Sequence, residues 1–289
     1  MKIRKVLIVY KKSSYETHVM EERDPNYLRL LREGNIATRS SKRLHREHRA
    51  SFEQVQRDLR ELGLRFDVRL RYHLKKPISA YDLVITIGGD GTFLETSHYL
   101  ESGVMLGINS APSESVGYYC RANRRNFRGR LIGLLRGRQR LQKLARLEVE
   151  VPGRRRSPLV LNDILFTNRN PAGTTRYRLR IAGVEEEQKS SGIWIAPAPG
   201  STAAIHSAGG KVLPLGSDKF QFVVREAYLP RGQRYRFLKR VLGKGQKIRL
   251  LSMMDDAALY LDGPHHVYRI RRGDVVTIRA AGSPLYAVW

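Results

Sequence analysis

The chain has 289 residues, of which 41% are hydrophobic and 28% are charged. This composition is that of a folded protein, and the length allows two domains or one large α/β domain with a β-rich addition. A single cysteine, Cys120, excludes an intramolecular disulfide and a four-cysteine zinc site, and it favours a cytoplasmic location. No apolar run approaches the roughly 18 residues of a membrane-spanning helix. The apolar run at residues 6–10 is too short for a signal peptide and predicts a first buried strand.

The charge is strongly positive, because 53 Lys and Arg residues outnumber 27 Asp and Glu residues and give a formal net charge of +26. Such a charge attracts polyanions of any kind and does not choose among them. The densest basic stretch runs from Arg121 to Arg156. Its apolar residues recur at helical spacing and predict an amphipathic helix with a solvated cationic face: Phe127, Leu131, Leu134 and Leu135. Nucleic acid is the less favoured partner, because no aromatic stacking platform accompanies the charge.

Strands and helices alternate over roughly the first 120 residues. Apolar runs at 83–87 and 104–108 and an alternating run at 66–70 predict strands. Ser51-x-x-Gln54 has the form of a capping box and predicts a helix over residues 51–62. The segment 11–45 is polar and poorly periodic, so we expect a long mobile loop there. The alternation indicates a doubly wound α/β unit, whose ligand should lie at the carboxyl ends of the strands.

The pattern changes beyond about residue 140. Apolar residues alternate with polar ones in several short runs separated by Gly, Pro and Asp turns: 147–151, 177–181, 220–224 and 275–278. These runs predict strands, so the second half is expected to be mostly β. The fold class is therefore α/β followed by a β-rich region.

The sharpest motif is Gly88-Gly89-Asp90-Gly91-Thr92, which follows the apolar run at 83–87. Thr92-x-x-Glu95 forms a second capping box and predicts that a helix opens here. Glycines let an anion approach the backbone, and the free N–H groups of a helix start favour phosphate. An aspartate in such a loop suits either the orientation of an acceptor hydroxyl or a position facing a metal ion that neutralises the phosphates, since phosphoryl transfer depends mainly on positioning and charge stabilisation. Gly-Asp-Gly also occurs in plain reverse turns, but the flanking strand and helix favour a phosphate loop.

A second glycine-rich segment runs from Pro197 to Ala204 and continues through His206-Ser207 to Gly209-Gly210. Its small and hydroxyl-bearing residues suit a wall against which an adenine or a ribose lies flat. Taken alone, the segment is better explained as a plain loop of small residues between strands. The chain has no Walker motif and no Gly-x-Gly-x-x-Gly, so neither a P-loop nor a hydride-transferring Rossmann domain is indicated.

Taken together and in this order, these motifs resemble the NAD kinase family over most of the chain. The resemblance rests on Gly88 to Thr92, Asn162-Asp163, Gly200 to Ala203 with Ser207 to Gly210, Gly107 to Asn109, and Asp262-Gly263. More narrowly, Lys11 to Glu16, Gly107 to Cys120 and Gln188 to Gly192 look like the mitochondrial-type NAD kinase of animals.

The resemblance implies a Rossmann-like, doubly wound N-terminal domain over residues 1–125 and a β-rich NAD-binding domain over 126–270. A C-terminal segment, 271–289, would return toward the first domain, and the active site would lie between the domains. ATP would be the phosphoryl donor, bound with Mg²⁺ or another divalent cation, and no residue is singled out as a metal ligand. Homodimers or homotetramers are usual in the family, and a site can borrow residues from a neighbouring subunit.

The resemblance also assigns roles to matching residues. Asp90 would be the catalytic base for the ribose 2′-hydroxyl of NAD. The other positions expected to bind nucleotide are Gly88, Gly89, Gly91, Thr92, Asn109, Asn162, Asp163, Ser191, Thr202, Ala203 and Ser207. Three positions differ from the common family pattern: Asp163 replaces a glutamate, Ser191 an aspartate, and Ala204 an aromatic residue.

The expected activity is thus NAD kinase, the ATP-dependent phosphorylation of NAD to NADP. Two alternatives stay open. A lipid kinase acting on a diacylglycerol-type substrate shares the Gly-Gly-Asp-Gly motif, although the second glycine segment suits a dinucleotide. A non-catalytic basic protein that binds nucleotide or nucleic acid on the same fold would also fit the charge of +26.

Overall fold

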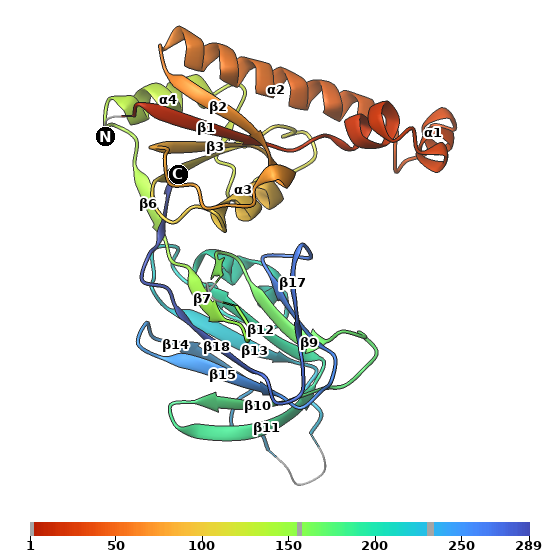
Figure 1. The fold of residues 1–289 in the computed structure, drawn as a ribbon, viewed down its shortest axis with the longest axis vertical. Helices are drawn as coiled ribbons and strands as arrows, with labels where there is room; N and C mark the ends of the chain where they lie inside the picture. Colours follow the sequence, from red (N-terminus) through yellow and green to blue (C-terminus); the bar gives the residue numbers. More distant parts are fainter. Residues whose placement is uncertain (1–2, 155–157, 230–233) are drawn as a thin grey trace. The chain divides into compact units, whose positions relative to one another are not determined.

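The computed structural model describes residues 3–154, 158–229 and 234–289 (Figure 1). Two compact units make up the chain: Met1–Gln142 with Tyr286–Trp289, and Lys143–Leu285. The division therefore falls between residues 142 and 143, whereas the sequence-based domain boundary falls after residue 125. The boundary after residue 125, between the expected nucleotide-phosphate domain and the expected NAD-binding domain, stays a prediction.

A seven-stranded sheet forms the base of the first unit, with the order β2-β1-β3-β4-β19-β6 and with β5 paired to β4. Its strands are β1 (Lys5–Tyr10), β2 (Arg65–Leu70), β3 (Leu83–Gly88), β4 (Val104–Asn109), β5 (Ala122–Asn123), β6 (Leu141–Leu144) and β19 (Leu285–Val288). The pairings β1·β2, β1·β3, β3·β4, β4·β5 and β4·β19 are parallel. β3 and β4 are buried throughout, as parallel strands covered on both faces are. The α/β prediction and its strands are confirmed.

Helices cover both faces of this sheet (Figure 1). α2 (Ser41–Glu61) and α4 (Phe127–Leu135) lie on one face, where Val55, Leu59 and Leu131 share a buried core with the sheet. α3 (Asp90–Ser97) lies on the other face and buries Phe93. No helix among the described residues is long and apolar enough to cross a bilayer.

The helix predicted at 127–135 is confirmed, and its apolar residues face the core. The rest of the basic stretch is not helical, since it continues as β6 and as strand β7 (Leu147–Glu150). Arg155 and Arg156, at the end of this stretch, lie outside the described residues.

Two predictions about the N-terminal segment are wrong. The segment 11–45 is not a loop: it contains the short helical turn η1 (Glu16–Glu21), helix α1 (Pro25–Arg32) and the start of α2. The Asp24 carboxylate caps α1 by accepting the N–H groups of Asn26 and Tyr27 at 2.9 and 3.2 Å. Ser51 is not a helix cap, because it lies inside α2 and its hydroxyl donates to the Glu47 carbonyl at 2.9 Å.

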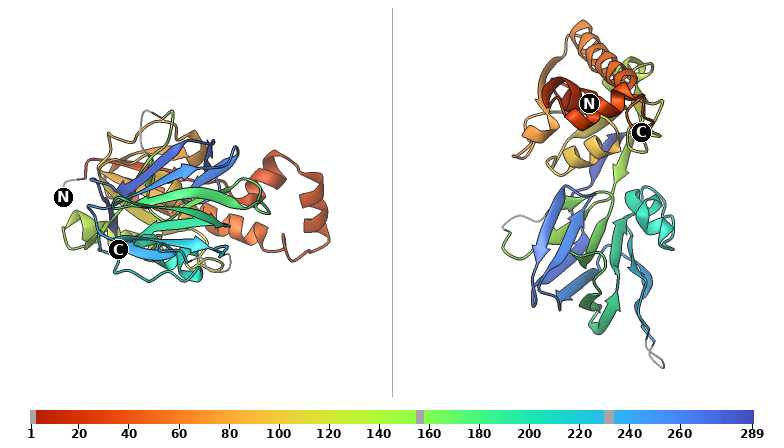
Figure 2. Two further views of the ribbon diagram at one scale, coloured as in Figure 1. Left: turned by 90° about the horizontal axis from the view of Figure 1, so that it is seen from below. Right: turned by 90° about the vertical axis from the view of Figure 1, so that its right-hand side faces the viewer.

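The second unit contains two antiparallel six-stranded sheets that face one another (Figures 1 and 2). One has the order β11-β10-β15-β18-β7-β8, with β8 (Leu159–Val160), β10 (Thr175–Ile181), β11 (Val184–Ser190), β15 (Lys247–Ser252) and β18 (Val275–Ala280). The other has the order β14-β13-β12-β9-β16-β17, with β9 (Ile164–Asn168), β12 (Gly192–Pro197), β13 (Phe220–Arg225), β14 (Lys239–Leu242), β16 (Ala257–Leu261) and β17 (His266–Ile270).

Alternating burial explains how these strands form one core. In β10, Tyr177, Leu179 and Ile181 are buried while the arginines between them are exposed. Their inward side chains meet those of the facing sheet, for example Phe166, whose ring lies 5.6 Å from that of Tyr177. The β-rich character predicted for the second half is confirmed.

Candidate active site

The Gly-rich motif lies where β3 ends and α3 begins, as expected. Gly88 is the last residue of the strand, Gly89 is the N-cap, and Asp90 is the first helical residue. A Cβ atom at Gly88 would collide with the Thr92 hydroxyl, so the turn requires glycine there. The Ser110 N–H donates to the Gly88 carbonyl at 2.9 Å and ties the turn to the end of β4. The strand, turn and helix start are confirmed.

The capping box predicted at Thr92 is wrong. α3 begins two residues earlier, at Asp90, and its N-cap Gly89 offers no side chain. Thr92 lies inside the first turn with 1% of its surface exposed, and its Oγ1 has no hydrogen-bond partner among the described residues. The helix start therefore keeps N–H groups that no capping side chain satisfies.

The Asp90 carboxylate is held by the backbone of a separate segment. One oxygen accepts the Tyr118 N–H at 2.8 Å, and the other accepts those of Tyr119 and Cys120 at 2.8 and 3.3 Å. The residue is only partly buried. These bonds fix the carboxylate in one orientation at the carboxyl end of the sheet.

Asn109 lies next to the glycine turn and forms hydrogen bonds within the loop that follows β4. It ends β4 opposite Gly88 in the strand register. Its side-chain amide donates to the Ser115 carbonyl at 2.7 Å, and its oxygen accepts the Ala111 N–H and the Ser115 hydroxyl at 3.1 and 3.0 Å. Asn109 thus shapes the loop that follows β4.

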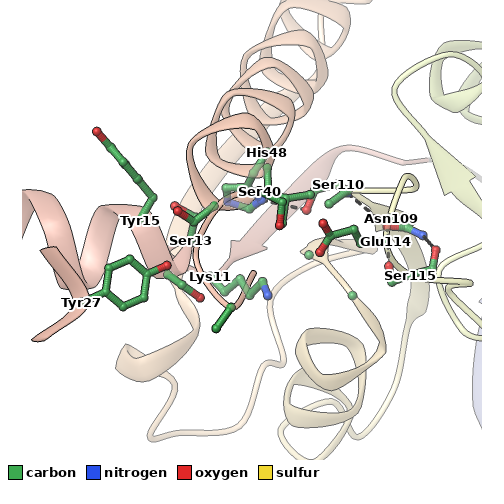
Figure 3. A pocket seen from close by; sticks show the side chains of 17 residues that line it. Lys11, Ser13, Tyr15, Tyr27, Ser40, His48, Asn109, Ser110, Glu114 and Ser115 are labelled. Carbon is green, nitrogen blue, oxygen red and sulfur yellow. Dashed lines mark hydrogen bonds between the residues drawn. The ribbon is translucent and has the colours of Figure 1, made fainter. Parts of the chain in front are cut away.

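A cavity of about 400 Å³ opens beside the glycine turn (Figure 3). Its lining includes the predicted residues Gly88, Gly89 and Asn109, whereas Asp90, Gly91 and Thr92 are not among the lining residues. The sequence analysis missed the rest of the lining, chiefly Lys11, Ser13, Tyr15, Tyr27, Ser40, Ser41, His48, Ser110, Glu114 and Ser115. Lys11 was accessible to sequence reasoning, because it directly follows β1, which pairs with β3.

Burial sets the electrostatics of this cavity. Burial lowers the pKa of the His48 imidazole to about 4, and its Nδ1 lies 2.8 Å from the Ser110 hydroxyl. His48 is therefore neutral at physiological pH. Burial, together with the nearby Arg71 guanidinium, also lowers the pKa of the Lys11 amine.

A second cluster of predicted residues forms in the second unit around Asp262. Its carboxylate accepts the N–H groups of Leu161, Asn162 and Asp163 at 2.9, 2.6 and 3.0 Å. A Cβ atom at Gly200 would overlap the Asn162 carbonyl oxygen, so the glycine lets the two loops touch. The structure thus brings together Asn162-Asp163, the Gly200 turn and Asp262.

Asp163 is the unusual carboxyl group of this cluster. Burial, and then the charge of Asp262, raise the pKa of Asp163 to about 7, and a hydrogen bond from the Asn162 amide opposes that rise. This Asn162 Nδ2 to Asp163 Oδ2 bond is 2.8 Å long. Asp163 therefore changes charge near neutral pH.

The glycine-rich segment after β12 exposes two of its hydroxyl-bearing residues, Thr202 and Ser207, and buries a third, Ser201. It forms the turn η3 (Pro199–Thr202) and the short helix α5 (Ala204–Ser207). Ser201 and Ile205 are buried and anchor it, while Thr202 and Ser207 are exposed and Ala203 is partly exposed. The predicted contact residues Thr202, Ala203 and Ser207 are thus accessible to a ligand.

Ser191 lies apart from these residues within the chain. It precedes β12, and its N–H donates to the Arg225 carbonyl at 3.0 Å. The Gly200 turn follows the other end of β12, about 20 Å away at the usual rise per residue. Ser191 instead lines a different cavity, of about 310 Å³, with Thr174, Lys189 and Tyr228 among its neighbours.

The known proteins that this chain is similar to are NAD and NADH kinases. No protein-family model matches the chain. The chain is 34% identical over 240 residues to a probable NADH kinase of Oryza sativa subsp. japonica, covering 75% of this chain and 74% of that protein. It is 29% identical to the NADH kinase of Arabidopsis thaliana, covering 76% of each.

Two solved structures share the fold. Yeast NADH kinase complexed with NADH superposes with a TM-score of 0.73 at 17% identity, over 100% of this chain and 84% of that one. The NAD kinase of Archaeoglobus fulgidus in complex with ATP gives a TM-score of 0.69 at 21% identity, over 99% and 93% of the two chains.

Replacement of Asp163 by Asn is expected to remove a pH-dependent loss of stability. The folded-state pKa of Asp163, about 7, is above the ordinary value of 3.8, so folding favours the protonated acid. The wild-type free energy of unfolding should therefore fall as pH rises from about 4 to about 7, by roughly 1 to 4 kcal/mol. Urea unfolding at pH 5 and pH 8 measures this difference. The exposed Asp255→Asn variant is the control, and identical pH profiles for all three proteins would contradict the assignment.

Replacement of Gly200 by Ala should destabilise the second unit, because the added methyl group has no space beside Asn162. We expect a cost of about 1 to 3 kcal/mol, the usual range for overpacking. Gly245, which has open space around it, provides the matched Gly245→Ala control. Thermal unfolding compares the two variants, and equal midpoints would show that the two loops do not depend on their close contact.

Proposed function

The chain belongs to the NAD kinase family, and we propose that it transfers the γ-phosphoryl group of ATP to the 2′-hydroxyl of the adenosine ribose of NAD, giving NADP. The observation that carries this proposal is the Asp90 carboxylate, fixed by N–H groups of Tyr118 and Tyr119 where a glycine turn starts a helix. The relatives support this reaction, since they are named as NAD and NADH kinases.

Asp90 would act on the acceptor. The ribose oxygen attacks the γ-phosphorus, the bond to the bridging oxygen breaks, ADP leaves, and the carboxylate takes the hydroxyl proton late in the step. A carboxylate held in one orientation suits this role, because phosphoryl transfer depends mainly on alignment. We assign Gly88, Gly89, Gly91 and Thr92 to the surroundings of the donor phosphates, where open N–H groups of α3 favour anions.

We assign the NAD contacts to the second unit. Asn162 and Asp163, held by Asp262, would bind the nucleoside part of NAD, and the exposed Thr202, Ala203 and Ser207 would line its site. Asn109 would act by shaping the loop after β4. Asp163 is one methylene shorter than the family's glutamate, so a water molecule is needed to bridge the longer gap.

A divalent cation is proposed to arrive with the triphosphate. Mg²⁺ in such sites is bound mainly by phosphate oxygens and water, with one or two carboxylates of the protein. We assign no protein ligand to it, because Glu114, which lines the cavity beside Gly88 and Gly89, already pairs with Arg43 at 3.3 Å. The cation would neutralise charge on the phosphates.

The finer likeness to the mitochondrial-type NAD kinase of animals, based on Lys11 to Glu16, stays a proposal, because the relatives found are plant and microbial proteins. A cytoplasmic location is likewise proposed from the single cysteine alone. The names of the two plant relatives favour NADH as a second acceptor.

We further propose that the enzyme is a homo-oligomer in which Ser191 completes the NAD site of a neighbouring subunit. The support for this proposal is the position of Ser191. In its own chain, Ser191 precedes β12, whereas the Gly200 turn follows the opposite end of that strand. Residues of a symmetric interface meet their partners in pairs, so each subunit would supply the other.

Replacement of Asp90 by Asn should lower kcat for NADP formation by at least about 100-fold, because it removes the acceptor of the proton and turns an amide N–H toward a backbone N–H. The assay uses ATP, Mg²⁺ and NAD, with NADH in a parallel series. The control is Asp67→Asn, since Asp67 is an exposed carboxylate that pairs with Lys5. Equal kcat values for Asp90→Asn and the wild type would refute the role of Asp90.

Shared sites predict complementation between two inactive proteins. Asp90→Asn and Ser191→Arg should each be nearly inactive alone, whereas a mixed pair of subunits should regain activity in about half of its sites, because one of its two sites then holds both wild-type residues. The mixture is prepared by coexpression and purified with two tags. Absence of any recovery in verified mixed oligomers would place Ser191 in its own chain's site or outside the site.

A further inference from the structure

The cavity beside the glycine turn is built largely by residues for which the proposed reaction has no role. They come from the N-terminal segment after β1 and from α2. Figure 3 shows Tyr15 and Tyr27 on one side of this cavity and Asn109 and Ser115 on the other, with Lys11 extending between them. A volume of about 400 Å³ is within the range of small-molecule sites.

Lys11 is the cation of this cavity. Its amino group has no hydrogen-bond or ion-pair partner among the described residues, although the side chain is only partly exposed. Its stem packs beside Gly88, since a Cβ atom built at Gly88 would lie 3.5 Å from the Lys11 Cγ. Leaving an ammonium partly buried without a counterion costs free energy, and an anion at the glycine turn would recover it.

A buried hydroxyl also lacks a partner here. Ser41 lines the cavity with 8% of its surface exposed, and its Oγ has no hydrogen-bond partner among the described residues. Buried polar atoms are normally satisfied by protein, ordered water or ligand, so this hydroxyl is available to a ligand atom in the cavity. The neighbouring His48 is neutral at physiological pH and adds no repulsion to Lys11.

The acidic residue in the described lining, Glu114, does not cancel the positive charge. Its carboxylate forms an ion pair with the Arg43 guanidinium, with an N–O distance of 3.3 Å. Arg43 also donates a hydrogen bond to the Ser113 hydroxyl at 2.7 Å. These contacts tie the loop after β4 to α2. The cavity therefore combines a lysine amine that has no partner among the described residues, the glycine turn at Gly88 and Gly89, and a paired carboxylate.

We propose that Lys11 is a positioning residue for the phosphoryl donor, its amine contacting an oxygen of the triphosphate chain beside Gly88 and Gly89. The proposal rests on the NAD kinase activity proposed above and adds the N-terminal segment to its donor site. ATP and inorganic polyphosphate share this chemistry, and their relative use distinguishes the two sources.

The test compares Lys11→Ala with Lys12→Ala, since Lys12 is its neighbour but pairs with Glu21 at 2.7 Å and does not line the cavity. We expect Lys11→Ala to raise KM for MgATP about 10- to 100-fold, the worth of one charged hydrogen bond, while KM for NAD changes little. Lys11→Arg should restore part of the loss, and Lys12→Ala should match the wild type. Ser41→Ala should raise KM for MgATP by about tenfold or less.

Calorimetry with inorganic tripolyphosphate, without NAD, gives a second readout that does not need turnover. If tripolyphosphate binds to the wild type and to Lys12→Ala but not to Lys11→Ala, the result supports the proposal. Absence of NADP formation in the same preparations would refute only the proposed activity. A higher KM for NAD with unchanged KM for MgATP, or equal losses in both lysine variants, overturns it. NADP formation with polyphosphate as efficient as with MgATP identifies polyphosphate as a source, whereas dependence on MgATP identifies the nucleotide.

Discussion

The first unit depends on the hydrogen bonds that tie the Asp90 carboxylate to the backbone of residues 118–120. That segment can approach because β4 has a glycine opposite it: a Cβ atom at Gly107 would lie 2.8 Å from the Tyr119 carbonyl. Phe93 of α3 stacks on Tyr119 with ring centres 5.5 Å apart. One carboxylate therefore joins the helix start, the strand end and the following loop, so the glycine turn and its aspartate act as one rigid piece.

The second unit uses the same device at a different place. The Asp262 carboxylate accepts the N–H groups of residues 161–163, as Asp90 does with those of 118–120. In both cases the oxygens of one aspartate side chain accept backbone N–H groups of an irregular loop, which stabilises the loop. The consequence differs: Asp90 is only partly buried, whereas the pKa of Asp163 is raised chiefly by its own burial and then by the neighbouring Asp262.

Much of the fold and part of the site could be predicted from local patterns. Apolar runs predicted the strands, and the glycines of 88–91 predicted the strand-to-helix turn. The two capping boxes failed for a physical reason: a Ser or Thr can cap a helix only if the helix starts there, and tertiary contacts extended α2 and α3 past Ser51 and Thr92. Lys11 directly follows β1 and could have been found from the strand order, whereas Ser41 lines the same cavity from α2, distant in sequence, so no local pattern contained it.

The net positive charge of the surface and the charge of Lys11 act over different distances. A net charge of +26 attracts both anionic substrates during diffusion, but salt screens exposed charges beyond about 8 Å at physiological ionic strength. Many of the arginines on α2 and α4 are exposed, and several already pair with acids, such as Arg43 with Glu47 and Arg128 with Asp58. Lys11 is partly buried and has no partner among the described residues, so its interaction with a phosphate would be screened far less. Steering therefore belongs to the surface as a whole, whereas in the arrangement proposed above Lys11, beside the glycine turn, would place the donor.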